Sequence, residues 1–251
     1  MKFLVEINYL GTNYSGWQRQ KSAVSIQETI ENQLANILGQ KINIVGCGRT
    51  DAGVHADQYF FHFIYASEIK DLKFILNKTL PTDIAVKNIY KVPSNFHAQR
   101  DAISRTYDYS VHSSKSALLE STSSWYDVNH WDFDSMAKAC ELVTANSDFG
   151  NFCLSPDSYP STICRIEETD LKVNNENQSW KFTITGNRFL RGMVRLITGQ
   201  LIEVGQNRIT VEDFHSFLIN EMKPKRHLRS YPQGLHLSKV VYPANFPFQV
   251  L

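Results

Sequence analysis

The stretch Gly46-Cys47-Gly48-Arg49-Thr50-Asp51-Ala52-Gly53-Val54-His55 gathers a carboxylate, a guanidinium and an imidazole among three glycines. Glycine lets the backbone adopt a positive φ or approach another group closely. An alternating apolar run at 41–45 precedes the stretch and an aromatic run at 59–65 follows it, so we expect a loop between two strands. Such loops often carry catalytic groups, but an aspartate in a turn also simply accepts a backbone N–H. The loop alone favours neither interpretation of Asp51.

The composition is that of a folded protein with a sizeable core. The chain has 251 residues, of which 42% are hydrophobic and 20% charged, and its formal net charge is +1. This composition excludes an intrinsically disordered chain. Residues 1–9 do not form a signal peptide and no apolar run is long enough to span a membrane, which favours a cytoplasmic location. With so small a net charge, a nucleic-acid surface must come from the placement of basic residues.

The sequence predicts neither a metal site nor a disulfide framework. The cysteines form no CxxC pair, and the histidines show no HxxxH or mixed Cys/His spacing. We therefore expect reduced thiols, no metal and no cofactor. The residues concerned are Cys47, Cys140, Cys153, Cys164, His55, His62 and His97.

The first half of the chain predicts the order strand, helix, two strands, helix, strand. Ser25 and Glu28 form a capping box for the first helix, and Gly39 ends it. The order is that of a ferredoxin-like βαββαβ domain. The expected strands are 3–9, 41–45, 59–65 and 84–92, the expected helices are 26–38 and 69–80, and the apolar face of the first helix is Ile26, Ile30, Leu34 and Leu38.

The second half predicts a similar order less clearly. We therefore expect an α+β fold of two ferredoxin-like halves, residues 1–103 and 104–251, with a mixed or antiparallel sheet and a catalytic cleft between the halves. The expected strands of the second half are 104–111, 166–173, 180–185 and 235–241, and the expected helices are 134–143, 189–204 and 211–219.

Arginines of the expected helix 189–204 and of its start form the second chemical signal. Arg188, Arg191 and Arg195 are three and then four residues apart, so they share one helical face, opposite an apolar face. They are either a solvated basic face or a site for a carboxylate or phosphates. A further basic run, which is either a solvated loop or a track for phosphates, comprises Lys223, Lys225, Arg226, His227 and Arg229.

The loop at 10–20 carries aromatic residues among glycines and polar residues. A single tryptophan commonly closes the edge of a core, which is one interpretation of Trp17. Beside Tyr14, Gln18 and Arg19, it can also stack on a base or a sugar. We include Trp17 among the expected substrate-binding residues.

Seven blocks in order resemble the TruA family of tRNA pseudouridine synthases over nearly the whole chain. The most specific is Gly48-Arg49-Thr50-Asp51-Ala52-Gly53-Val54-His55-Ala56, which is similar to the family's catalytic loop. The others are Tyr9-Leu10-Gly11-Thr12-Asn13-Tyr14-Ser15-Gly16-Trp17-Gln18; Leu76-Asn77 with Leu80-Pro81-Thr82-Asp83-Ile84; Ser104-Arg105-Thr106-Tyr107-Asp108-Tyr109; Asp148-Phe149 with Phe152; Phe189-Leu190-Arg191-Gly192-Met193-Val194-Arg195; and Gly234-Leu235-His236-Leu237.

The resemblance implies a cofactor-free homodimer that isomerises uridine to pseudouridine at positions 38–40 of the tRNA anticodon stem-loop. It implies Asp51 as nucleophile, Tyr107 as the residue that packs on the target base and Arg195 as the partner of Asp51. Three roles stay open for Asp51: attack on ribose C1′, attack on uracil C6, or removal of a proton in a glycal route. The expected substrate-binding residues are Arg49, Trp17, His55, Arg188, Arg191, Leu235 and Leu237.

Some residues depart from the family pattern. Gln99 stands where the family usually has arginine, Arg100 follows it, and the approach to Gly234 contains Tyr231 instead of an alanine-rich segment. They motivate the alternative of a non-catalytic or weakly active RNA-binding paralogue. A glycosidase-like hydrolase is disfavoured, because such enzymes use two opposed carboxylates and the Asp51 loop offers one.

Overall fold

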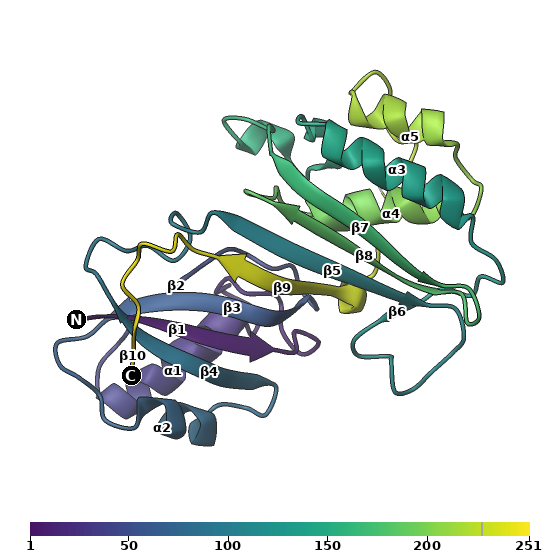
Figure 1. The fold of residues 1–251 in the computed structure, drawn as a ribbon. Coiled ribbons are helices and arrows are strands. Elements are labelled where there is room, and N and C mark those ends of the chain that lie inside the picture. Colours follow the sequence, from purple (N-terminus) through teal and green to yellow (C-terminus); the bar gives the residue numbers. More distant parts are fainter. Residues whose placement is uncertain (227) are drawn as a thin grey trace. The chain divides into compact units, whose positions relative to one another are not determined.

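The chain folds into two compact units in a computed structural model that describes residues 1–226 and 228–251 (Figure 1). The first unit comprises Met1–Ser104 and His236–Leu251, and the second comprises Arg105–Leu235. Both combine helices with a sheet, so the predicted α+β class is confirmed. Among the described residues, no helix is long and apolar enough to cross a membrane.

The first unit has the predicted βαββαβ order. Strand β3 pairs antiparallel with β1, β4 pairs antiparallel with β1, and β2 pairs with β3, which gives the ferredoxin-like order β4-β1-β3-β2. The elements are β1 (Lys2–Tyr9), α1 (Ile26–Leu38), β2 (Val45–Gly46), β3 (His55–Ile64), α2 (Leu72–Thr79), β4 (Ile84–Val92), β9 (Leu235–Val241) and β10 (Gln249–Val250).

Helix α1 begins and ends where the sequence predicts. The Ser25 side chain accepts a hydrogen bond from the Glu28 N–H at 3.2 Å, and Gly39 ends the helix with a φ of 68°. Ile30 and Leu34 of the predicted apolar face are buried. Figure 1 shows α1 and α2 on one face of the sheet formed by β1, β3 and β4. Local caps and helical periodicity therefore determined this element.

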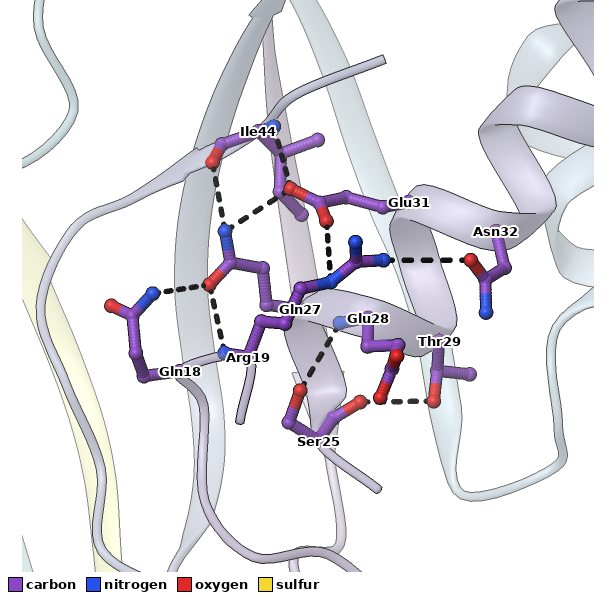
Figure 2. A network of polar contacts seen from close by, with 9 residues as sticks. All are labelled: Gln18, Arg19, Ser25, Gln27, Glu28, Thr29, Glu31, Asn32 and Ile44. Atoms are coloured by element: carbon purple, nitrogen blue, oxygen red, sulfur yellow. Dashed lines mark hydrogen bonds and ion pairs between the residues drawn. The ribbon is translucent and has the colours of Figure 1, made fainter. Parts of the chain in front are cut away.

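The expected strand at 41–45 is wrong except at its last residue. Ile42 and Ile44 are buried, as their alternation predicts, but the backbone of Ile44 bonds to helix α1 instead of a strand. Its N–H donates to Glu31 Oε1 at 3.2 Å, and its carbonyl accepts from Gln27 Nε2 at 3.3 Å (Figure 2). Burial against a helix produced an alternation that resembles that of a strand.

Apart from the two-residue strand β6 and the last helix α5, the second unit has the order βαββα. Strand β8 pairs antiparallel with both β5 and β7, so the strands correspond to the first, third and second of a ferredoxin-like sheet. Figure 1 shows α3 and α4 on one side of β7 and β8. The elements are β5 (Ser104–His112), β6 (Ser124–Trp125), α3 (Phe133–Ala145), β7 (Ile166–Asn174), β8 (Ser179–Gly186), α4 (Met193–Gly205) and α5 (Val211–Leu218), with short 3-10 turns at Gly150–Phe152, Pro156–Ser158 and Pro232–Gly234.

The C-terminal segment differs from the predicted division at residue 103. That division places residues 104–251 together, whereas His236–Leu251 belongs to the first unit. His236 pairs with His55 in a parallel ladder, and Val250 pairs with Tyr90. These pairings are non-local, so composition along the chain gives no sign of them.

Helix α4 begins at Met193, and the prediction of a helix from Phe189 is wrong. Gly192 adopts a left-handed φ of 73°, which ends the preceding loop, and the carbonyl of Arg191 accepts a hydrogen bond from the Leu154 N–H at 3.0 Å. Arg188 and Arg191 therefore lie in a loop and do not share a helical face with Arg195. The helix is buried around most of its circumference, because the second unit packs on several sides of it.

Candidate active site

Asp51 lies in the loop between β2 and β3 and is half-buried. Its carbonyl accepts the N–H of Val54 at 3.2 Å, and Gly53 takes a φ of 77° inside the resulting turn. Arg49, two residues earlier, is exposed. The loop is thus a tight, glycine-dependent turn, as the sequence predicts, and it leaves part of the Asp51 side chain accessible.

The segment at 9–17 holds the Asp51 loop on both sides. The N–H of Trp17 donates to the carbonyl of Thr50 at 3.2 Å, and the Tyr9 hydroxyl lies 2.9 Å from Thr50 Oγ1. On the other side, the N–H of Gly53 donates to the carbonyl of Tyr14 at 3.2 Å. The residues flanking Asp51 and Ala52 are therefore fixed by hydrogen bonds, which limits the positions that the carboxylate can adopt.

Tyr14 is itself anchored through its side chain. Its hydroxyl donates to Asp83 Oδ1 at 2.6 Å. Burial, and then the hydrogen bond and the negative charge of Asp83, raise the pKa of Tyr14 above its ordinary value. The tyrosine thus remains a donor and ties the Asp51 support to the start of β4.

Trp17 is a core residue, and the expected stacking role is corrected. Its side chain is 2% exposed, and its ring lies 4.1 Å from the ring of Tyr59 between centroids. A buried indole has no face for a base. Its contribution to the site is the backbone hydrogen bond to Thr50 described above.

His55 is also buried, so an expected direct contact with substrate is not supported. Its Nδ1 accepts the N–H of Gly11 at 2.9 Å, and its ring lies 4.7 Å from that of His236. His236 Nδ1 is 3.0 Å from Asp57 Oδ1. Across residues 1–226 and 228–251, no three His, Cys, Asp or Glu side chains are grouped so that they could hold a metal ion. His55 therefore supports the loop at Gly11.

In the second unit, Tyr107 is half-buried on β5, opposite Ile184 of β8. Its ring meets the ring of Phe189 edge to face, with centroids 5.1 Å apart and an interplanar angle of 83°. Edge-to-face contact fixes the ring while leaving part of its surface exposed. Part of the Tyr107 side chain is therefore accessible to solvent.

Arg195 lies in the first turn of α4 and is half-buried. Its Nε donates to the carbonyl of Ser230 at 2.8 Å, and the N–H of Ser230 donates to the carbonyl of Arg195 at 3.0 Å. This reciprocal pair fixes the guanidinium at one edge and joins α4 to the segment that precedes β9.

The remaining expected binding residues divide into exposed arginines and buried leucines. Arg188 and Arg191 are exposed, and Arg188 Nη2 donates to the carbonyl of Ser161 at 2.5 Å. Leu235 and Leu237 are buried. In the basic run, Lys223, Lys225, Arg226 and Arg229 are exposed, and His227 lies outside the residues that the structure describes.

A hydroxyl cluster around Tyr109 was not predicted. The Tyr109 hydroxyl lies 2.8 Å from Ser124 Oγ and 3.4 Å from the Tyr126 hydroxyl, and it donates to the carbonyl of Tyr231 at 3.0 Å. Burial is the main cause that raises the pKa of Tyr109. The alternation of Tyr107 and Tyr109 places both on one face of β5, which is the sequence signal that could have identified the cluster.

Comparison with known proteins identifies an enzyme class. The family model of tRNA pseudouridine synthases matches residues 7–100 and 139–243. The chain therefore belongs to the tRNA pseudouridine synthase family, whose members are isomerases that act on uridines of tRNA. The resemblance predicted from the sequence is confirmed.

Individual relatives match over almost their full length. A tRNA pseudouridine synthase A of Acetivibrio thermocellus is 39% identical over 94% of this chain and 97% of the relative. The protein of the same name from Porphyromonas gingivalis is 35% identical over 97% and 98%. That of Parabacteroides distasonis is 36% identical over 99% of both chains. The similarity thus includes both units.

Proposed function

We propose that this chain converts uridine to pseudouridine at positions 38–40 in the anticodon stem-loop of tRNA, with Asp51 as the nucleophile. The observation that carries the proposal is the support of the Asp51 turn at Thr50 and Gly53 by the segment at 9–17. A carboxylate held in this way keeps one position while a bulky nucleotide enters, which lowers the cost of orientation.

The reaction rearranges the bonds of one nucleotide. The bond from C1′ to N1 of uracil breaks, a bond from C1′ to C5 forms, the C5 proton leaves and N1 gains a proton. The base must turn while it is detached, so the enzyme has to hold both the sugar and the free uracil. A carboxylate suits the first task, as a nucleophile at carbon or as a base.

Tyr107 and Arg195 complete the proposed chemistry. The base first leaves the stack of the RNA, and the ring of Tyr107 offers a replacement surface. Arg195 pairs with Asp51, a role supported by the orientation that Ser230 gives to its guanidinium. Leu235 and Leu237 line the pocket, and the exposed Arg49 helps to hold the target nucleotide out of its stack. The exposed Arg188 and Arg191 bind phosphates.

The test is pseudouridine formation in unmodified tRNA transcripts that carry uridine at 38, 39 or 40. The native chain is compared with Asp51→Asn, which keeps the shape of the side chain. Asp71→Asn is the control, because Asp71 is an exposed carboxylate whose left-handed φ of 55° asparagine accepts readily. We expect product with the native chain and the control, and none with Asp51→Asn.

Each other outcome contradicts a different part of the proposal. Activity of Asp51→Asn would refute the nucleophile, and product at other uridines would refute the anticodon positions. Binding of transcripts by the native chain without product would favour an RNA-binding paralogue, and Gln99 and Tyr231 would then be the residues to revert.

We also propose that the active form is a homodimer. The resemblance implies a tRNA site built from two chains. We therefore predict that a positive stripe crosses the subunit boundary, and that it includes Arg49, Arg188, Arg191 and the basic run at 223–229. Sedimentation at micromolar concentration tests this, and a monomer would contradict it. The cytoplasmic location stays a prediction from the sequence.

A further inference from the structure

The Tyr231 side chain is a large aromatic group on the surface, next to the Arg195 support. It is 53% exposed, and its inner face lies against Tyr126, with ring centroids 5.2 Å apart and an interplanar angle of 32°. Tyr231 directly follows Ser230, whose carbonyl accepts the hydrogen bond from Arg195. One face of the ring is thus covered by protein, and more than half of the side chain is accessible.

The backbone of Tyr231 is fixed at both of its polar groups. Its carbonyl accepts the hydroxyl of Tyr109 at 3.0 Å, and its N–H donates to the hydroxyl of Tyr126 at 3.4 Å. Tyr109 is fully buried, and Pro232 follows in a 3-10 turn. The backbone is thus fixed, and the contact with Tyr126 orients the ring before any ligand binds, so little conformational entropy is lost on binding.

Exposed basic residues precede Tyr231 closely in the sequence. Arg229 and Tyr231 are both exposed, whereas Ser230 between them is buried. Lys225 and Arg226 are exposed a few residues earlier. An exposed aromatic ring two residues after an exposed arginine suits single-stranded nucleic acid, because a base can stack on the ring and a phosphate can contact the cation.

We propose that Tyr231 is a stacking platform for an unpaired nucleobase of tRNA and that Arg229 binds a neighbouring phosphate. The proposal goes beyond the chemistry of the target uridine, and it rests on tRNA as the substrate. It gives a function to a residue that departs from the alanine-rich pattern of the family. Because stacking needs only a π-face, the platform contributes affinity for any base at that place.

The experiment measures binding of tRNA transcripts with cytidine at 38–40, which avoids turnover at the proposed sites. The variants are Tyr231→Ala, Tyr231→Leu, Tyr231→Trp and Arg229→Gln of the full chain, each titrated over a range of salt concentrations. Phe74→Ala is the matched control. Phe74 is also an exposed aromatic residue near a cation, since it is 63% exposed and its ring centroid lies 5.6 Å from Lys78 Nζ, but it belongs to α2 in the other unit. Tyr231→Leu keeps apolar packing on Tyr126 in case the alanine variant fails to fold.

We expect Tyr231→Ala and Tyr231→Leu to weaken binding about tenfold, which is about 1.4 kcal/mol, at every salt concentration. Tyr231→Trp and Phe74→Ala should bind like the native chain. Arg229→Gln should instead reduce the slope of log Kd against log salt by about one, since one phosphate contact is lost. Stacking and charge are thereby separated.

The proposal would be overturned if Tyr231→Leu bound the transcripts as tightly as the native chain. It would also be overturned if Phe74→Ala lost as much affinity as the tyrosine variants. A change of salt slope in the tyrosine variants would overturn it as well, because a stacked ring releases no counterions. Loss of self-association together with affinity would show that a protein chain covers the ring instead. None of these outcomes depends on Asp51, so an active Asp51→Asn would refute the proposed function and leave this result unaffected.

Discussion

The N–H of Trp17 donates a hydrogen bond of 3.2 Å to the carbonyl of Thr50, the residue directly before Asp51. A buried core residue thereby fixes the backbone next to an accessible carboxylate. The neighbour of Trp17, Gly16, comes closer still. A Cβ at Gly16 would lie 2.4 Å from the same Thr50 oxygen, and its φ is 88°. The approach of these two segments thus depends on a residue without a side chain.

We predict that Gly16→Ala displaces the Asp51 loop and lowers activity more than tenfold. The added methyl group meets backbone atoms that cannot move without breaking the bond from Trp17, and the positive φ adds strain of about 1–3 kcal/mol. Thermal unfolding and pseudouridine formation are measured together. The control is Gly39→Ala at the end of α1, which has a φ of 68° but nothing within 4 Å of a new Cβ.

Gly39→Ala should lower Tm by a few degrees and leave the rate per folded molecule unchanged. If Gly16→Ala behaves in the same way, then the loop tolerates displacement and the support at Thr50 does not determine activity. The comparison separates the strain of a positive φ from the close approach at the site.

Local signals predicted much of the fold, and non-local contacts account for what they missed. The ends of α1 are determined by Ser25 and Gly39, which are immediate neighbours of the helix in the sequence. In contrast, the predicted arginine face failed because Gly192 turns the chain and Arg191 bonds to Leu154, a residue far away in the sequence. Helical spacing indicates a shared face only if the helix already exists.

In the site, too, some features follow from residue types and others depend on three-dimensional packing. The glycine-flanked turn at Asp51 could be predicted from residue types alone. The burial of Trp17 could not, because a tryptophan beside polar residues is equally compatible with a core and a binding surface. Its ring packs on Tyr59 of β3, which is a contact between segments far apart in the sequence.

We predict that Glu31 contributes more to stability than its ion pair does. Its carboxylate is largely buried and accepts hydrogen bonds from the Ile44 N–H and from Gln27, besides lying 3.1 Å from Arg19 (Figure 2). Arg19 is 38% exposed, so its part of the pair is screened by water. Glu31→Ala should cost about 2–3 kcal/mol, since it leaves a buried N–H without its acceptor.

Arg19→Gln should cost less than about 1 kcal/mol. Urea unfolding, which adds no salt, measures the free energy of unfolding of both variants. Equal losses would show that the ion pair, and not the acceptor for Ile44, carries the stabilisation.

We predict that Arg195→Lys lowers the rate of pseudouridine formation by about 100-fold or more. Lysine is a point charge, so it cannot keep the bond to Ser230 and also offer the planar pair of donors that the proposed pairing with Asp51 requires. Arg208→Lys is the control, because Arg208 is well exposed just after the end of α4 and pairs with Glu203 of that helix at 2.9 Å. A rate for Arg195→Lys that matches the rate for Arg208→Lys would refute the proposed pairing of Arg195 with Asp51.

The last prediction concerns acid stability. His62 Nδ1 accepts the N–H of Ala98 at 3.1 Å, and burial, then the charges of Lys2 and His97, lower the pKa of His62 to about 4. The native state therefore holds this ring neutral, whereas the unfolded chain binds a proton below pH 6.5. The contribution of the neutral His62 ring to the free energy of unfolding is therefore complete above pH 6.5, and it is lost as the pH falls towards 4.

At 1.36 kcal/mol per pKa unit, this loss amounts to at most about 3 kcal/mol between pH 6.5 and 4. The pKa of His97 is also lowered, so the native chain loses somewhat more than His62 alone accounts for. His62→Asn retains an acceptor for Ala98 but cannot titrate, so its unfolding free energy should fall less over the same range. Urea unfolding of the native chain and of His62→Asn at several pH values tests this prediction. If the unfolding free energies of the two proteins fell in parallel with pH, then His62 would titrate in the native state at its ordinary pKa.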